Sequence, residues 1–216
     1  MGAWNPKEFK DVCLQSGLSE ALVYVESLIV KKWAAIHHKE NIEKRLNELK
    51  ETGLRSSPQQ VLQYEKEVTF ELDALMATLN SVWDILAQLI NECFVKTDSS
   101  EVSFSKFSNP KECCYRLIPS EIQPILKSIR GNTLYRTIKA YTNVSKHRYL
   151  PLGEIYMNVS AKPRKVSYVT PEFEYKKGEW QRLAIDKAFK CLEFVIKSVD
   201  QVGAKIHELV KLRNIT

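Results

Sequence analysis

Residues 136–148 hold the side chains of this sequence that are best suited to chemistry on a phosphate group. The segment contains an imidazole, His147, and a carboxamide, Asn143. A histidine titrates near neutral pH and can exchange protons, while cations beside it can hold a phosphate and stabilise the charge that develops on it. Metal-free phosphodiester transfer requires these two functions together. The cations of the segment are Arg136, Lys139, Lys146 and Arg148.

A helix would sort these residues onto two faces. At about 100° per residue, one side of the helix carries the apolar residues and should face the core. The opposite side gathers the polar and cationic ones. The apolar set is Leu134, Ile138, Tyr141 and Val144, and the polar set is Arg136, Lys139, Asn143, Lys146 and His147. A solvated basic helix face with an incidental histidine remains an alternative interpretation.

The charge of the chain is concentrated around this segment. Residues 1–100 carry 11 basic and 15 acidic side chains, whereas residues 101–216 carry 21 and 11. The window 127–165 holds nine lysines and arginines against Glu154 alone. Such a concentration suggests an anionic partner, with nucleic acid as the first candidate and an acidic protein as another. Five tyrosines in or near the window could stack on bases: Tyr135, Tyr141, Tyr149, Tyr156 and Tyr168.

Other familiar chemistries have no pattern here. The sequence lacks the glycine-rich phosphate-binding motifs and the nucleophile elbow of α/β-hydrolases. The histidines and the five cysteines have no zinc-ligand spacing, so we expect no metal site and no cofactor. An odd number of cysteines without a C-x-x-C pair fits reduced thiols. With no apolar stretch of membrane-spanning length and no signal segment at Met1, we expect a soluble cytoplasmic protein without membrane association.

Two long helices should position the basic segment. One is predicted over residues 18–52, with Leu18, Leu22, Val25, Ile29, Trp33 and Ile36 as its apolar stripe, resumed by Leu46 and Leu49. The second, over residues 58–94, has ten seam positions at alternating spacings of four and three residues, nine of them apolar. The short connection between them makes the two helices antiparallel neighbours.

Shorter helices follow, and then the pattern changes. Alternation around Ile155, Met157 and Tyr168 predicts a small β-hairpin insertion near residues 154–175, and a final helix is expected over residues 180–213. The sequence therefore predicts an all-α, up-and-down bundle of four to five main helices with this insertion, in a single domain over residues 1–216.

The run Tyr141-Thr142-Asn143, three further residues and His147 resembles the signature of the HEPN superfamily (higher eukaryotes and prokaryotes nucleotide-binding). That signature is an arginine, four to six residues and a histidine, often written Arg-Asn-x-x-x-His, on a late helix of an all-α bundle. The order of elements expected here is similar. Asn143 and His147 match the signature, but Thr142 stands where the arginine should be.

The resemblance implies a function. Family members are commonly dimeric, many are metal-independent ribonucleases, and bacterial ones often belong to toxin–antitoxin or defence systems. In them the histidine acts as general acid/base or orienter and the arginine contacts the phosphate. Because Thr142 replaces that arginine, we expect a homodimeric domain that binds RNA or nucleotide through the basic helix face without catalysis. An arginine at position 142 would complete the motif.

Two alternatives stay open. One is an active metal-independent ribonuclease that uses His147, with Asn143 beside it. The other is a non-enzymatic helical module for protein interaction or dimerisation.

Overall fold

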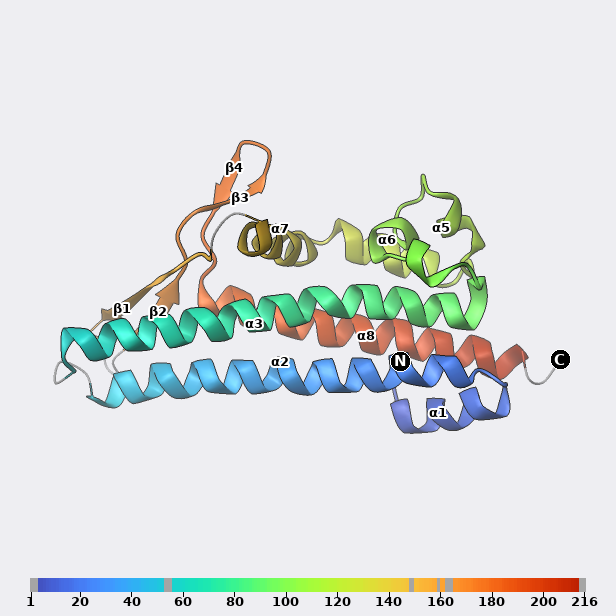
Figure 1. Ribbon diagram of the computed structural model, residues 1–216, viewed down its shortest axis with the longest axis horizontal. Coiled ribbons are helices and arrows are strands. Elements are labelled where there is room, and N and C mark those ends of the chain that lie inside the picture. Colours follow the sequence, from blue (N-terminus) through green and yellow to red (C-terminus); the bar gives the residue numbers. More distant parts are fainter. Residues whose placement is uncertain (1–3, 53–55, 148–149, 159, 162–164, 214–216) are drawn as a thin grey trace. The chain divides into compact units, whose positions relative to one another are not determined.

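The computed structural model describes residues 4–52, 56–147, 150–158, 160–161 and 165–213. Helices take up 73% of these residues, and two small antiparallel β-hairpins provide the strands (Figure 1). The prediction of a mainly helical fold with a small β insertion is thereby confirmed. The chain groups into two compact units, residues 1–32, 81–135 and 193–216, and residues 33–80 and 136–192, which are described separately.

Three long helices run through the sequence, and shorter elements lie between them. The long ones are α2 (Ser19–Thr52), α3 (Pro58–Ile90) and α8 (Ile185–Arg213). The shorter helices are α1 (Pro6–Gln15), η2 (Asn91–Val95), η3 (Ser99–Glu101), α4 (Phe104–Phe107), α5 (Cys113–Leu117), α6 (Gln123–Gly131) and α7 (Thr133–His147). The strands are β1 (Glu154–Asn158), β2 (Lys165–Val169), β3 (Phe173–Lys176) and β4 (Glu179–Gln181).

Helix α3 follows its predicted seam. Ser57 and Gln60 cap its start reciprocally, since the Ser57 amide donates to the Gln60 side chain at 2.8 Å and the Gln60 amide donates to the Ser57 hydroxyl at 3.3 Å. The π-helical turn η2 extends it, and Lys96 ends it in the left-handed region with φ 61°. The predicted core residues are all fully buried: Val68, Leu72, Leu75, Leu79 and Leu86.

The predicted inner face of α2 is wrong over its first half. Of the predicted stripe up to Ile36 only Val25 is buried, and Trp33 is 73% exposed. The buried positions follow the same four-three spacing as α3, but two positions of this repeat are occupied by Lys32, which is exposed, and Lys39, which is half-buried. These lysines interrupt the apolar pattern and made the neighbouring Trp33 look like a seam residue. The buried residues are Ala21, Val25, Leu28, Ala35, Ile42, Leu46 and Leu49.

Within the unit of residues 33–80 and 136–192, polar contacts show that α2 and α3 are antiparallel. His38 Nδ1 lies 2.6 Å from Glu71 Oε2, and the Asn41 amide donates to Glu71 Oε1 at 2.9 Å. One turn further along α2, Arg45 Nε lies 2.7 Å from Glu67 Oε2. Residue numbers therefore rise along α2 as they fall along α3, as the short connection predicted.

The β insertion is longer than predicted. Strands β1 and β2 pair from Glu154 opposite Val169 to Asn158 opposite Lys165, and β3 and β4 form a second hairpin that reaches Gln181. Trp180 accordingly belongs to β4, and the last helix begins at Ile185 rather than at residue 180. The sequence predicts one hairpin near residues 154–175, whereas β2 ends at Val169 and a new strand begins at Phe173.

Contacts with α3 hold the first hairpin in place. The Tyr168 hydroxyl lies 2.6 Å from the Thr69 hydroxyl and accepts the Gly153 amide at 2.9 Å. A Cβ at Gly153 would lie 2.5 Å from the Tyr168 ring, so only glycine fits there. Glu65, the one polar residue of the predicted seam, accepts the backbone amide of Ile155 at 3.0 Å. A side chain at a seam position of α3 therefore accepts a hydrogen bond from a backbone amide of the β1 strand.

In the other unit, polar side chains of α3 and η2 hold the segment that follows them. Asn91 accepts the Thr97 amide at 3.0 Å and donates to the Thr97 carbonyl at 2.9 Å. One helical turn earlier, Gln88 donates to the Ser99 carbonyl at 2.9 Å, and Asp84 accepts the Phe104 amide at 3.0 Å. These bonds fix the course of the chain before α4.

Candidate nucleic-acid interface

Helix α7 carries the predicted site. The Asn132 side chain accepts the Leu134 amide at 2.8 Å and so caps the first turn. Ile138, Tyr141 and Val144 face inward as expected, whereas Leu134 is only half-buried. Inward-facing apolar residues fix the rotation of the helix, and thereby decide which side chains reach solvent.

The opposite face of α7 is polar and accessible. Arg136, Asn143, Lys146 and His147 are exposed, and Lys139 is half-buried. Lys146 and His147 make no hydrogen bond or ion pair within residues 4–147 or the other described stretches. Both groups are therefore accessible to a ligand. The sixth predicted site residue, Arg148, lies outside the described residues.

Thr142 lies on the other side of the helix. It is 3% exposed, and its hydroxyl donates to the Ile138 carbonyl at 2.9 Å. An arginine at this position would enter the packed interior and would not share the exposed face with His147. The burial of Thr142 therefore argues against the expectation that arginine at position 142 would complete the motif.

A hydrogen bond ties α7 to α3. The Ser145 hydroxyl donates to the Asp73 carboxylate, and both side chains are partly buried. A bond to a charged acceptor is stronger than one between neutral groups. It holds the last turn of α7, where Lys146 and His147 follow directly.

The second β-hairpin reaches the polar face of α7 and lines with it a cavity of about 330 Å³ that is open to solvent. Phe173 of β3 packs edge-on against the Tyr141 ring, with 5.6 Å between ring centroids and 90° between planes. The Tyr141 ring is fully buried, and this burial raises the pKa of its hydroxyl. The cavity is lined by Ala140, Asn143, Val144, Glu174, Tyr175, Lys176 and Lys177.

The cavity adds cations and an aromatic ring that the sequence did not assign to the site. Lys176 pairs with Glu179 at 2.7 Å, whereas Lys177 is exposed and makes no ion pair with any described residue. Tyr175 lies half-buried beside them. A lysine, an aromatic ring and the Asn143 carboxamide together suit a phosphate joined to a base. The only signal for this cavity in the sequence is a tyrosine followed by two lysines, Tyr175, Lys176 and Lys177.

The structure limits which tyrosines can stack on bases. Tyr135, Tyr141 and Tyr168 are buried, whereas Tyr156 is 47% exposed. Tyr149 lies outside the described residues. The expectation that the three buried rings stack on a ligand is wrong, because each is occupied in the core.

The structure and comparisons with known proteins add three findings. Among the described residues, His, Cys, Asp and Glu side chains form no cluster of three or more that could hold a metal ion. No helix in that part of the chain is long and apolar enough to span a membrane. No protein-family model, curated protein or solved structure matches the chain.

Proposed function

We propose that this chain is a HEPN-like domain that binds RNA or nucleotide through the exposed face of α7, without cleaving it. The observation that carries the proposal is the adjacency of the α7 face to the cavity under the β3–β4 hairpin, with Asn143 common to both. Arg136, Lys139 and Lys146 supply positive charge along the helix. Lys177 supplies more at the cavity.

Electrostatic attraction would provide most of the affinity. Lysine and arginine contacts to phosphates release condensed counterions, which favours binding at low salt. The cavity would add a smaller, orienting contribution, because a base beside Tyr175 leaves water and can hydrogen-bond to Asn143. Single-stranded RNA fits this arrangement, since its bases are free to leave the stack.

The absence of cleavage is proposed from the position of Thr142. Phosphodiester transfer by this motif needs a cation on the phosphate next to the histidine, and residue 142 points into the core. Lys146 is adjacent to His147 in sequence, but it is exposed and its side chain is flexible, so it does not hold a cation in a fixed place beside the histidine. His147 is therefore expected to contact RNA without transferring protons at a useful rate.

The test is RNA binding by matched variants. Fluorescence anisotropy with a labelled single-stranded RNA at low salt should show binding by the natural protein. Lys139→Ala and Lys146→Ala should each weaken it about three- to tenfold, the effect of one lost phosphate contact. Lys190→Ala removes the same charge from an exposed position on α8 and should change the affinity less than twofold.

The same RNA tests the ribonuclease alternative, which the shared exposure of Asn143 and His147 favours. Incubation without metal should leave the RNA intact. Metal-independent cleavage that disappears in His147→Ala would show that the domain is an enzyme. Equal binding by all three lysine variants would remove the α7 face from the proposal.

We extend the proposal to assembly. The HEPN resemblance favours a homodimer with α7 near the two-fold axis, where two copies of the basic face would combine. Such a pairing would double the positive charge offered to one RNA strand.

A further inference from the structure

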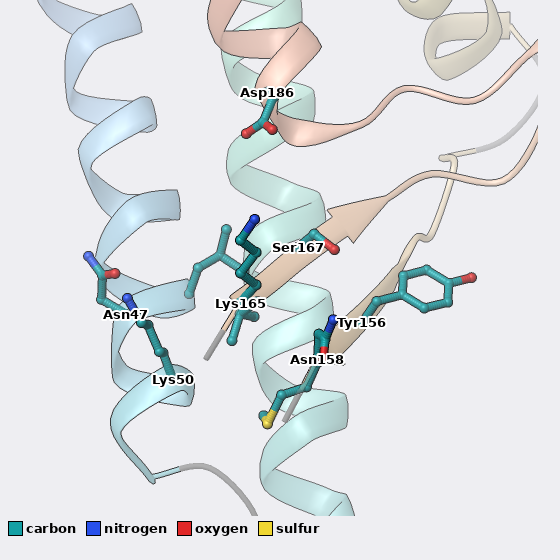
Figure 2. A pocket seen from close by; sticks show the side chains of 10 residues that line it. Asn47, Lys50, Tyr156, Asn158, Lys165, Ser167 and Asp186 are labelled. Atoms are coloured by element: carbon teal, nitrogen blue, oxygen red, sulfur yellow. The ribbon is translucent and has the colours of Figure 1, made fainter. Parts of the chain in front are cut away.

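A cavity of about 600 Å³ lies beside the β1–β2 hairpin, between the end of α2 and the start of α8. The two lysines that line it are directed apart, since Lys50 projects from α2 and Lys165 extends toward Asp186 (Figure 2). The described lining of this cavity therefore holds no pair of cations that converge on one ligand. Two reactive side chains do converge in the other unit, on α5.

Helix α5 places two thiols next to each other. Cys113 is exposed, Cys114 is half-buried, and neither belongs to a disulfide. Their Sγ atoms lie 3.9 Å apart, although neighbouring side chains on a helix project about 100° from each other. The other three cysteines of the chain are buried. The accessible thiol chemistry of the protein is therefore concentrated in this pair.

Hydrogen bonds fix the chain on either side of the pair. Before it, the Glu112 amide donates to the Asn109 carbonyl at 2.9 Å, and the Asn109 side chain donates to the Glu112 carboxylate at 3.3 Å. After it, Ile118 is buried, its amide donates to the Tyr115 carbonyl at 3.3 Å, and its carbonyl accepts the Gln123 side chain at 2.8 Å. These contacts preorganise the two thiols and so lower the entropic cost of binding a ligand.

The spacing of the two sulfurs suits a bridging atom better than a disulfide bond. Adjacent Cα atoms are about 3.8 Å apart across a trans peptide, which is below the separation of about 4.4–6.8 Å that disulfides usually have. A tetrahedral centre with bonds of about 2.3 Å holds two sulfurs about 3.8 Å apart, close to the 3.9 Å observed here. The pair is therefore arranged to chelate one thiophilic atom.

The number of ligands decides which thiophilic atom fits. A structural zinc ion takes four ligands from the protein, but the described residues form no cluster of three or more His, Cys, Asp or Glu side chains that could hold a metal ion. Trivalent arsenic that carries one organic group has two valences left, and two thiols complete them. Its bonds to sulfur have a similar length and a narrower angle, so the two sulfurs need to approach each other only slightly.

We infer that Cys113 and Cys114 form a binding site for trivalent arsenicals that carry one organic group. The exposed Cys113 attacks the arsenic first, and Cys114 then closes the chelate ring. Two arsenic–sulfur bonds form, the bond from arsenic to oxygen breaks, and the two thiol protons leave with that oxygen as water, so no oxidant or reductant is needed. Burial raises the pKa of the Cys114 thiol, and its hydrogen bond with Cys113 raises it further, so this thiol holds its proton at neutral pH.

The site goes beyond the proposed RNA binding and does not depend on it. Neither cysteine belongs to α7 or lines the cavity under the β3–β4 hairpin.

Isothermal titration of the reduced full chain with phenylarsine oxide tests the inference. One arsenical should bind per chain, and the intact mass should rise by one phenylarsenic group less two hydrogens. Cys113→Ser and Cys114→Ser should each weaken binding at least about a hundredfold, because the second bond of a chelate forms within the same molecule. The control Cys191→Ala removes a buried thiol and should change the affinity less than twofold.

Two competitors separate chelation from attachment to a single thiol, and they act on the natural protein without any substitution. Dimercaptopropanol, which offers two neighbouring thiols, should remove the arsenical, whereas mercaptoethanol at the same thiol concentration should leave it bound. Circular dichroism of both serine variants should match that of the natural protein, since neither position is buried. Absence of binding by the natural protein, unchanged affinity in either serine variant, or equal removal by the two competitors would overturn the inference.

Discussion

The sequence motif and the structure predict opposite effects for the substitution Thr142→Arg. The motif would make it a gain of function, whereas the structure makes it a burial of charge. Thr142 is 3% exposed and its hydroxyl is bonded to the Ile138 carbonyl. The larger side chain overpacks the interior at a cost of about 1–3 kcal/mol. Burying the guanidinium without a partner adds several kcal/mol, of which snorkelling recovers a part.

The net loss expected for Thr142→Arg is about 4 kcal/mol. For a chain of this length each kcal/mol corresponds to roughly 2–4 °C, so the midpoint of thermal unfolding should fall by about 8–16 °C. Far-ultraviolet circular dichroism during heating measures this directly. Asn143→Arg introduces the same side chain one residue away at an exposed position, and should leave the midpoint within about 2 °C. An unchanged midpoint in Thr142→Arg, or a gain in metal-independent RNA cleavage, would refute the placement of residue 142 in the core.

Three further predictions concern the core, the thiols and assembly. Leu79→Ala should cost about 2–5 kcal/mol in urea unfolding, whereas Trp33→Ala, at the wrongly predicted face of α2, should cost less than about 0.5 kcal/mol. Burial raises the pKa of Cys191 from 9.0 to about 12, so the folded chain keeps a proton that the unfolded chain releases, and stability should fall as the pH rises from about 9 toward 12. Urea midpoints measured over this pH range should fall less in Cys191→Ala, and a parallel fall would contradict the assignment. Light scattering at tens of micromolar should give the mass of a dimer, and a monomer would contradict the proposed assembly.

The strength of the apolar repeat decides how well the buried face of each long helix can be predicted from the sequence. In α3, nine of ten seam positions are apolar, and the core residues predicted from them are buried. In α2, Lys32 and Lys39 interrupt an equivalent repeat. Lys39 remains compatible with its position because its long side chain reaches the Phe189 ring, with 5.3 Å from Nζ to the centroid. An apolar repeat is found by counting apolar residues, so it misses a lysine whose aliphatic chain packs inside.

Only part of the candidate site could be predicted from the sequence, and the reason is related. The exposed face of α7 follows from local helix geometry, and so Arg136, Asn143, Lys146 and His147 could be found from spacing. The cavity beside them depends on the contact of Phe173 with Tyr141, two residues far apart in sequence. No local pattern shows that a hairpin returns to a particular helix.

The salt dependence of RNA binding tests the central claim most directly. Each phosphate contact to a single strand contributes about 0.7 to the slope of log affinity against log salt concentration. The double variant Lys139→Ala/Lys146→Ala should therefore have a slope smaller than that of the natural protein by about 1.4. Identical slopes for the two proteins, or no binding by the natural protein at the lowest salt concentration, would contradict the claim that α7 holds the RNA backbone.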